Sequence, residues 1–286
     1  MLDAHSIPLR GAAGIGVAGN FAGHLEQAGE AADFARVTAT EPTAPKGIFP
    51  WYLPNRDDFL GCFPLAHGRL ELPDAAGDHH LQIEPEVGVV FLVDYRDDRV
   101  VGLTPRAAGA FNDCSIRRPG AAKISHKKNW GPASKGLAPL LFPVDDIEPD
   151  GALGRLRIAS FLRRGDQVYA YGIDSAAADY SYSGSRLVDW LLDRLVHQTG
   201  SDDTPLEPVG RHLAEAGRPE LLLVGIGATR YTPLGESTYL DDGDESVVVV
   251  YDSETSAPDR VEDAVRAGAE DGIPSASVLV QRVAVP

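Results

Sequence analysis

Three carboxylates in the first half of the chain have the residue type and spacing of a metal site. Glu84 and Glu86 lie two positions apart, and Asp113 follows them after an apolar stretch. Residues 81–93 are rich in β-branched and aliphatic side chains, which predicts a strand whose alternate residues point to one face. Paired negative charge in an apolar setting is unfavourable unless a cation lies between the carboxylates. The pattern therefore predicts a site for a hard divalent cation such as Mg²⁺.

The elements that would position these carboxylates are predicted from hydrophobic periodicity. A helix-like stretch follows at residues 105–112, and a loop rich in Lys, Gly and Pro spans residues 124–142. Residues 153–162 and 167–173 predict a β-hairpin around the turn Arg-Arg-Gly-Asp. Residues 185–197 predict an amphipathic helix, because apolar side chains recur there at helical spacing.

The N-terminal part combines a glycine-spaced segment, a predicted helix and a proline-rich arm. Residues 14–19 match the pattern Gly-x-Gly-x-x-Gly, but no clear strand precedes them and no βαβ unit follows, so we do not expect a nucleotide-binding loop. Asn20 is placed to cap a helix over residues 21–34. The prolines of residues 40–75 exclude long helices and central strands there.

The last part of the chain changes character. Strand-like residues 246–251, helix-like residues 259–267 and strand-like residues 275–285 predict a small β-α-β appendage. We therefore expect a core over residues 1–245, which includes the predicted helix of residues 21–34 and the proline-rich arm. A C-terminal extension over residues 246–286 is expected to pack on that core.

Composition limits the classes of partner and location. The chain has 286 residues, 43% of them hydrophobic, enough for an ordinary globular core. Its net charge of −16 argues against a nucleic-acid partner, which needs a basic footprint. The longest apolar runs are too short to span a bilayer, and the start shows no secretory signal. With Cys62 and Cys114 as the two cysteines, we expect reduced thiols and a cytoplasmic location.

Four segments, taken in order, resemble motifs of the fumarylacetoacetate hydrolase superfamily. The first is Gly19-Asn20-Phe21-Ala22-Gly23-His24, which is similar to the opening Gly-x-Asn-Tyr-x-x-His. The second is Glu84-Pro85-Glu86, which is similar to the metal pair Glu-x-Glu. The third is Asn112-Asp113-Cys114-Ser115-Ile116-Arg117, which is similar to Asn-Asp-Val-Ser-Ala-Arg, and the fourth is Lys128-Asn129-Trp130, comparable with Lys-Ser-Phe. The resemblance covers residues 14–245.

The resemblance implies a fold, a metal and an assembly. The fold would be α+β and mainly β, with a mixed β-roll core, peripheral helices and the small C-terminal β-α-β appendage outside it. Glu84, Glu86 and Asp113 would bind one Mg²⁺ or Mn²⁺. Members of the superfamily are usually dimers, so a homodimer is expected.

Roles for the side chains around the metal also follow from the resemblance. The predicted helix of residues 21–34 would be a lid over the catalytic core, and His24 and Gln27 are the candidate catalytic residues on it. Lys128 would donate to the substrate carboxylate or the developing oxyanion, and Lys127 is the alternative. Asn20, Thr229 and Arg117 are the candidate substrate-binding residues, with Arg117 alternatively bracing the metal aspartate.

Two departures from the superfamily pattern affect the chemistry. Members that cleave or decarboxylate pair the lid histidine with a glutamate three residues later, and here that residue is Gln27. Glutamine positions a water but cannot take its proton, while Glu26 and Glu30 are at other angles on the predicted helix. The strand-like residues 220–229 end in Thr229 without the expected Thr-Gly-Thr.

The resemblance implies an enzyme that acts on a small 2-oxo or β-diketo acid. The expected reaction is hydrolysis of a C–C bond or decarboxylation through a metal-stabilised enolate. One alternative is a hydratase or isomerase of similar acids, which needs enolisation but no hydrolytic water. The other is a non-catalytic metal- or ligand-binding protein on the same fold.

Overall fold

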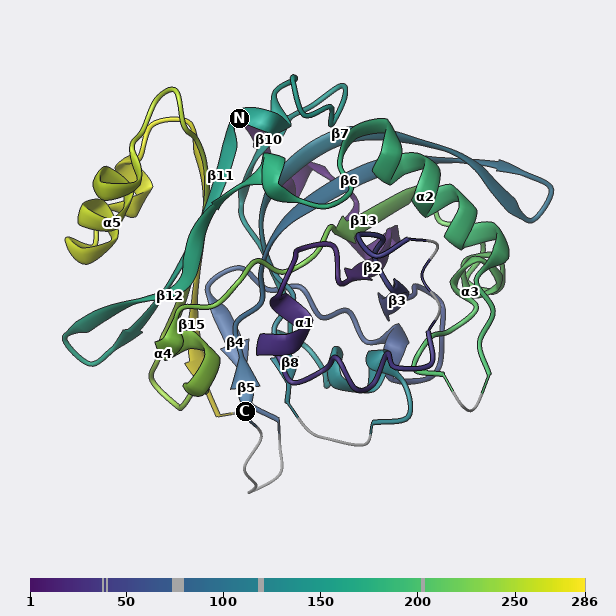
Figure 1. Cartoon of the computed structure of the whole chain (residues 1–286), viewed down its shortest axis with the longest axis horizontal. Coiled ribbons are helices and arrows are strands. Elements are labelled where there is room, and N and C mark those ends of the chain that lie inside the picture. The colour runs from purple at the N-terminus through teal and green to yellow at the C-terminus, as the bar shows by residue number, and fades with distance from the viewer. Residues whose placement is uncertain (38, 40, 74–79, 118–120, 202–203, 286) are drawn as a thin grey trace.

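The computed structural model describes residues 1–37, 39, 41–73, 80–117, 121–201 and 204–285. Within them the chain forms two large mixed sheets and a short ribbon, with helices at the periphery (Figure 1). The first sheet has the order β1-β10-β7-β6-β13-β2-β3, with β9 also paired to β7. Its strands are β1 (Leu2–Asp3), β2 (Ala13–Ala18), β3 (Gly47–Tyr52), β6 (Pro85–Arg96), β7 (Arg99–Asn112), β9 (Gly136–Leu137), β10 (Leu140–Pro143) and β13 (Leu221–Gly225).

The long hairpin of β6 and β7 is the backbone of this sheet. β13 flanks β6 on the edge opposite β7, and the β6 side chains from Val87 to Phe91 are at most 1% exposed at the non-glycine positions. Such continuous apolar runs are typical of strands buried on both faces. The edge strand β3 contains Pro50, which fits an edge because proline cannot donate a hydrogen bond to a further strand.

The second sheet has the order β12-β11-β14-β15-β4. Its strands are β4 (Arg69–Glu71), β11 (Leu156–Arg164), β12 (Gln167–Ala176), β14 (Glu245–Asp252) and β15 (Ala276–Ala284). The predicted hairpin of residues 153–173 is β11 and β12, which pair antiparallel. The ribbon consists of β5 (Leu81–Gln82) and β8 (Ser115–Ile116).

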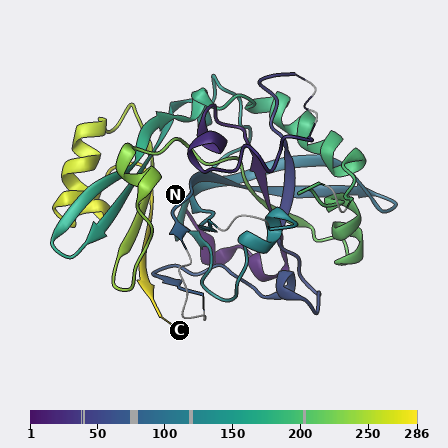
Figure 2. The same cartoon turned by 60° about the horizontal axis from the view of Figure 1, so that its bottom comes forward.

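The C-terminal residues have the predicted order of strand, helix and strand. Helix α5 (Pro258–Arg266) lies on the outer side of the second sheet, and its Val261 and Val265 pack with Val247, Val249 and other side chains of that sheet (Figures 1 and 2). β14 pairs antiparallel with both β11 and β15, so this segment completes the sheet begun by earlier strands. The division of the chain at residue 245 stays a prediction.

Helix α2 (Gly184–His197) matches the predicted amphipathic helix, with Leu187, Leu191 and Leu195 buried on one side. The other helices are α1 (His24–Gln27), α3 (Val209–Glu215) and α4 (Pro233–Ser237). The fold is therefore α+β and mainly β, as predicted from the sequence. None of the helices in the described part of the chain has both the length and the apolar character that a membrane crossing requires.

The predicted helix over residues 21–34 is wrong in extent, because only the four residues of α1 are α-helical. Gly23 and Gly29 adopt positive φ angles of 83° and 69°, which start and end the helix abruptly. Asn20 does not cap it: the side-chain amide of Asn20 donates to the carbonyls of Tyr182 and Ile226 instead. We call residues 21–37 the lid segment.

The predicted helix-like stretch at residues 105–112 is also wrong, because these residues form the second half of β7. Alanine-rich sequence favours a helix locally, but pairing with β6 along the whole hairpin overrides that preference. The glycine-spaced residues 14–19 are β2 and the turn after it, where Trp51 and Phe49 fill the space that side chains at Gly14 and Gly16 would need.

Candidate metal centre

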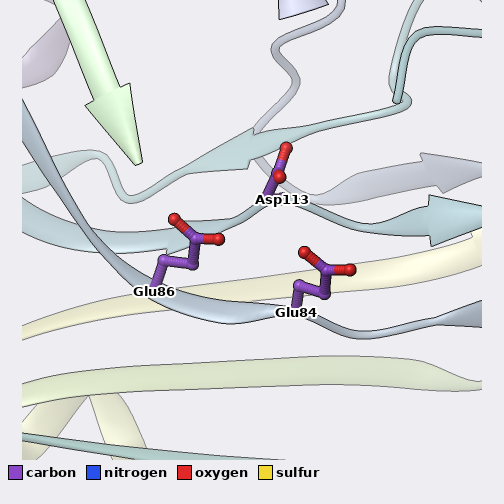
Figure 3. Close-up of side chains that lie close together, drawn as sticks. All are labelled: Glu84, Glu86 and Asp113. Carbon is purple, nitrogen blue, oxygen red and sulfur yellow. The ribbon is translucent and has the colours of Figure 1, made fainter. Parts of the chain in front are cut away.

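Adjacent strand ends bring the three carboxylates together. Glu84 directly precedes β6, Glu86 is its second residue, and Asp113 directly follows β7. The register pairs Pro85 with Asn112, and the Asp113 amide donates a 3.0 Å hydrogen bond to the Glu84 carbonyl. Figure 3 shows the side chains of Glu84 and Glu86 rising from one ribbon toward Asp113.

The carboxylates form a compact and buried cluster. One oxygen atom from each residue can be chosen so that all three lie within 4.8 Å of one another. Glu84 is 3% exposed, Glu86 2% and Asp113 0%. Three acidic groups so close together in an apolar interior require positive charge.

Lys128 supplies part of that charge. Its Nζ donates hydrogen bonds of 2.6 Å to Glu84 Oε2 and of 2.6 Å to Asp113 Oδ2. The short 3₁₀ helix Ile124–Lys127 ends directly before Lys128 and aims it at the cluster. Lys127 points elsewhere, to Glu30 and Asp33 of the lid segment at 2.9 Å each. Of the two lysines that the sequence left open, Lys128 is the one at the carboxylates.

Two further cations extend the contacts on either side. Lys135, fully buried, lies 3.2 Å from Asp113 Oδ1 and donates to the Cys114 carbonyl. Arg117 lies 2.5 Å from Glu84 Oε1 and 2.8 Å from Glu30 Oε1. The result is one row of alternating charge, which we call the ion-pair chain: Glu30, Arg117, Glu84, Lys128, Asp113 and Lys135.

The carboxylates differ in their electrostatic setting. Burial opposes the charge of Glu84, but Lys128 and Arg117 outweigh it and lower its pKa. Burial, with repulsion from Asp113 and Glu84, raises the pKa of Glu86 well above its ordinary value. Burial also raises the pKa of Asp113, although Lys128 and Lys135 oppose the shift. Glu86 is thus the carboxylate with the greatest need for a further cation.

The cluster retains oxygen atoms that a metal could use. Glu84 Oε1 and Asp113 Oδ1 are buried and accept no hydrogen bond within the described ranges, although Arg117 and Lys135 are close enough for ion pairing. Glu86 Oε2 accepts one hydrogen bond, 3.0 Å from the Gly227 amide. An all-carboxylate donor set suits a hard divalent cation, so the residues fit a divalent metal site.

His24 borders the same site. It is 5% exposed, and its Nδ1 lies 2.9 Å from the Thr229 carbonyl. A carbonyl oxygen only accepts, so this partner assigns the proton of the neutral ring to Nδ1 and leaves Nε2 with a lone pair. Burial lowers the pKa of His24, which favours that neutral form. His24 therefore has the protonation state of a base.

The structure places Gln27 away from the carboxylates. Its side chain bonds the backbone of Tyr231, accepting from the amide at 2.9 Å and donating to the carbonyl at 3.1 Å. Glu30 takes the place beside the site instead. Because α1 ends and Gly29 turns the chain at positive φ, Glu30 is buried and reaches Arg117 and Lys127.

The other predicted site residues are engaged within the fold. The Asn20 amide holds two backbone carbonyls, and Asn20 Oδ1 accepts from the Tyr182 amide. Thr229 is 1% exposed and contacts His24 through its backbone carbonyl. Arg117 also bonds Gln82 Oε1 at 2.6 Å and the Tyr231 hydroxyl at 3.0 Å, which makes it a brace of the site.

A small cavity lies against the cluster. It has a volume of about 20 Å³, which is room for about one water molecule. Glu84, Glu86 and Lys128 line it, and the lid segment contributes His24, Leu25, Glu30 and Phe34. The cavity is therefore too small for an organic acid with the lid segment in this position.

The sequence matches a family model over most of its length. A family model described as "Family of unknown function (DUF5718)" matches residues 30–283. The chain belongs to this family. A comparison of the sequence with curated proteins finds no match.

Solved structures identify the fold. The structure of Cg1458 with inhibitor is 13% identical, with a TM-score of 0.55, covering 96% of this chain and 77% of that one. The structure of 5-carboxymethyl-2-hydroxymuconate delta-isomerase from Mycobacterium smegmatis is 17% identical, with a TM-score of 0.50, covering 96% and 79%. Both are proteins of the fumarylacetoacetate hydrolase superfamily, and the DUF5718 chain shares their fold.

Sequence reasoning missed two charged residues of this DUF5718 protein. A continuous helix over residues 21–34 would turn Glu30 away from the site, but the helix ends before Glu30, and Gly29 is the sequence signal for that end. Lys135 lies in the loop predicted for residues 124–142, where nothing local distinguishes a buried lysine from a solvated one. Its burial depends on the distant contact with Asp113.

Proposed function

We propose that this protein is a metal-dependent enzyme acting on a small 2-oxo or β-diketo acid. The reaction is hydrolysis of a C–C bond or decarboxylation, and the ion is Mg²⁺ or Mn²⁺, bound by Glu84, Glu86 and Asp113. The observation that supports this most is one cavity bordered by Glu84, Glu86, a lysine and a neutral histidine, with Asp113 completing the buried carboxylate cluster. The fold shared with superfamily proteins agrees with it.

The chain's own residues divide the chemistry. A bound divalent ion would supply Lewis-acid polarisation of the substrate's adjacent oxygens. Lys128 provides a positive donor for the substrate carboxylate, or for oxyanion charge as the bond breaks. His24 Nε2 accepts the proton of an attacking water or of the substrate. The lid segment then excludes bulk water.

A hydratase or isomerase of similar acids is the second candidate. Hydrolysis in the superfamily pattern uses a carboxylate beside the lid histidine, but Gln27 is bound to the Tyr231 backbone and Glu30 is held by Arg117 and Lys127. Enolisation needs His24 as a base but no such partner. The similar structure whose name gives an isomerase agrees with this reading.

A non-catalytic binding protein is the third candidate. Lys128 bridges Glu84 and Asp113, which partly neutralises the cluster without a metal. A protein without catalytic activity would keep this fold, because the Lys128 ammonium group stabilises the carboxylates in the absence of a metal.

One screen separates the three candidates. The purified protein is incubated with Mg²⁺ or Mn²⁺ and oxaloacetate, acylpyruvates or fumarylpyruvate, while pyruvate release and ultraviolet absorbance are followed. Pyruvate release that requires the metal supports cleavage. Loss of absorbance without pyruvate supports hydration or isomerisation. If no acid reacts while oxalate still raises the melting temperature with Mn²⁺, the result supports the binding protein. Glu86→Gln is the matched control for metal dependence.

A further inference from the structure

A second hollow adjoins the metal cavity across the lid segment. This groove has a volume of about 250 Å³, compared with about 20 Å³ for the cavity. Gly19 and Leu25 line both spaces, so these residues form the partition between them. The other side chains that matter on its walls are Lys46, Glu26, Pro42 and Ser181.

The partition indicates where a substrate's tail would go. The cavity holds about one water molecule, so any acid longer than its metal-binding head must extend out of it. Movement of Leu25, which belongs to the lid segment, joins the cavity to the groove. The partition is thin at Gly19, because the absence of a side chain there lets Leu25 and Lys46 pack against the backbone: a Cβ atom would lie 2.8 Å from Leu25 Cδ1 and 3.3 Å from Lys46 Cγ.

The groove wall carries one lysine, Lys46, whose ammonium group forms no ion pair or hydrogen bond with the described residues. The backbone amide of Lys46 is bonded to the Ala18 carbonyl, which fixes its position at the start of β3. Its ammonium group has no ion-pair or hydrogen-bond partner anywhere in the described ranges, unlike Lys127, Lys128 and Lys135. The chain has a large excess of acidic residues, so an unpaired lysine beside a site for acids is notable.

We propose that this groove is the subsite for the substrate's tail and that Lys46 recognises a carboxylate at its far end. The substrate class is then a dicarboxylic oxo acid, with its head at the metal and its distal carboxylate at Lys46. Glu26 on the lid side of the groove opposes that anion and moderates its affinity. The inference rests on the proposed function, because the head must bind at the carboxylate cluster.

Matched pairs of oxo acids test the subsite. Binding of 2-oxoglutarate is compared with that of 2-oxopentanoate, and 2-oxoadipate with 2-oxohexanoate, by titration calorimetry with Mn²⁺ present. Each pair differs only in a distal carboxylate or methyl group. Oxalate, which has no tail, reports binding at the head alone.

We expect the diacid of at least one pair to bind the parent protein more tightly. Lys46→Met should weaken that diacid about fivefold to tenfold, on the scale of an ordinary hydrogen bond because Lys46 is partly exposed, and should leave oxalate and the monoacid unchanged. Lys46→Arg should retain most of the preference. Glu26→Gln should strengthen the diacid, since it removes a like charge.

The possible results are distinguishable. Equal binding within every pair, or a preference that survives Lys46→Met, overturns the subsite while oxalate binding leaves the proposed function standing. If the parent protein does not bind oxalate with Mn²⁺ present, the result contradicts the proposed function and therefore also the subsite. Lys46 is partly exposed, so its variants are expected to fold, and unchanged oxalate affinity confirms that each has done so.

Discussion

Glu86 differs from its two neighbours because no cation contacts it among the described residues; it accepts one hydrogen bond, from Gly227. Its charge is therefore unfavourable in the metal-free protein and favourable once a metal binds. Glu86→Gln should keep or raise the melting temperature without metal, yet abolish the rise that Mn²⁺ produces. When the free Mn²⁺ concentration is a hundred times the Kd, binding adds about 2.7 kcal/mol to the free energy of unfolding.

Thermal melts with and without Mn²⁺ measure both effects, and Asp145→Asn, at an exposed acidic residue, is the control. A Glu86→Gln protein that keeps the parental Mn²⁺ response would show that Glu86 is no ligand.

The same residue predicts a dependence of stability on pH. Because the pKa of Glu86 is raised in the folded protein, the folded state holds this proton after the unfolded state has released it. The metal-free protein should then lose stability as the pH rises from about 4.5 through the raised pKa. Denaturant melts of the parent and of Glu86→Gln at several pH values measure this, and identical pH profiles would contradict the shift.

Substitution of Lys128 should lower the stability of the metal-free protein, whereas Glu86→Gln should keep or raise it. Lys128→Met leaves the buried charges of Glu84 and Asp113 with fewer partners, so the metal-free protein should lose about 3–5 kcal/mol of unfolding free energy. Mn²⁺ should restore part of that loss. Denaturant melts with and without Mn²⁺ measure the loss and its recovery. A variant as stable as the parent would show that the ion pairs of Lys128 with Glu84 and Asp113 contribute little.

His24 is tested by turnover and stability together. His24→Ala should lower kcat by roughly a hundredfold or more on the scale of general-base effects, while metal affinity stays near that of the parent. A variant with normal turnover per folded molecule but a lower melting temperature would make His24 a packing residue.

At the scale of the element, the lid segment depends on a turn that only glycine adopts easily. Gly29 has a φ of 69°, and a side chain there would meet nothing within 4 Å, so Gly29→Ala changes the backbone cost alone. We expect a local cost of about 1–2 kcal/mol and faster amide exchange across residues 24–36. Gly11→Ala is the matched control, since Gly11 also has open space but no positive φ.

The lid segment also marks where sequence reasoning stopped. Glu84, Glu86 and Asp113 could be predicted because strand periodicity and motif order are local signals. The placement of Glu30 depended on where a helix ends, and that of Lys135 on a contact across the fold. The helix predicted for residues 105–112 is wrong for a related reason: pairing with β6, which is distant information, decides their conformation.

At the scale of the whole molecule, the homodimer stays a proposal. Leu92 is 39% exposed on β6 and lines a groove of about 400 Å³ together with Leu2, Ile7 and Leu221. Exposed apolar surface on a sheet is typical of an interface. Light scattering should give a dimer for the parent and a monomer for Leu92→Glu, with the exposed Val285→Glu as control; a monomeric parent would remove the proposal.

The ion-pair chain would couple closure of the lid segment to the binding of a metal at the carboxylate cluster. Arg117 is shared between Glu30 on the lid segment and Glu84 at the cluster. A cation that takes over the charge of Glu84 leaves Arg117 more strongly attracted to Glu30, which favours the closed lid. By reciprocity, a closed lid must raise the affinity for that cation by the same factor. Lid closure and metal binding would thus be linked within a single chain, through one shared guanidinium group.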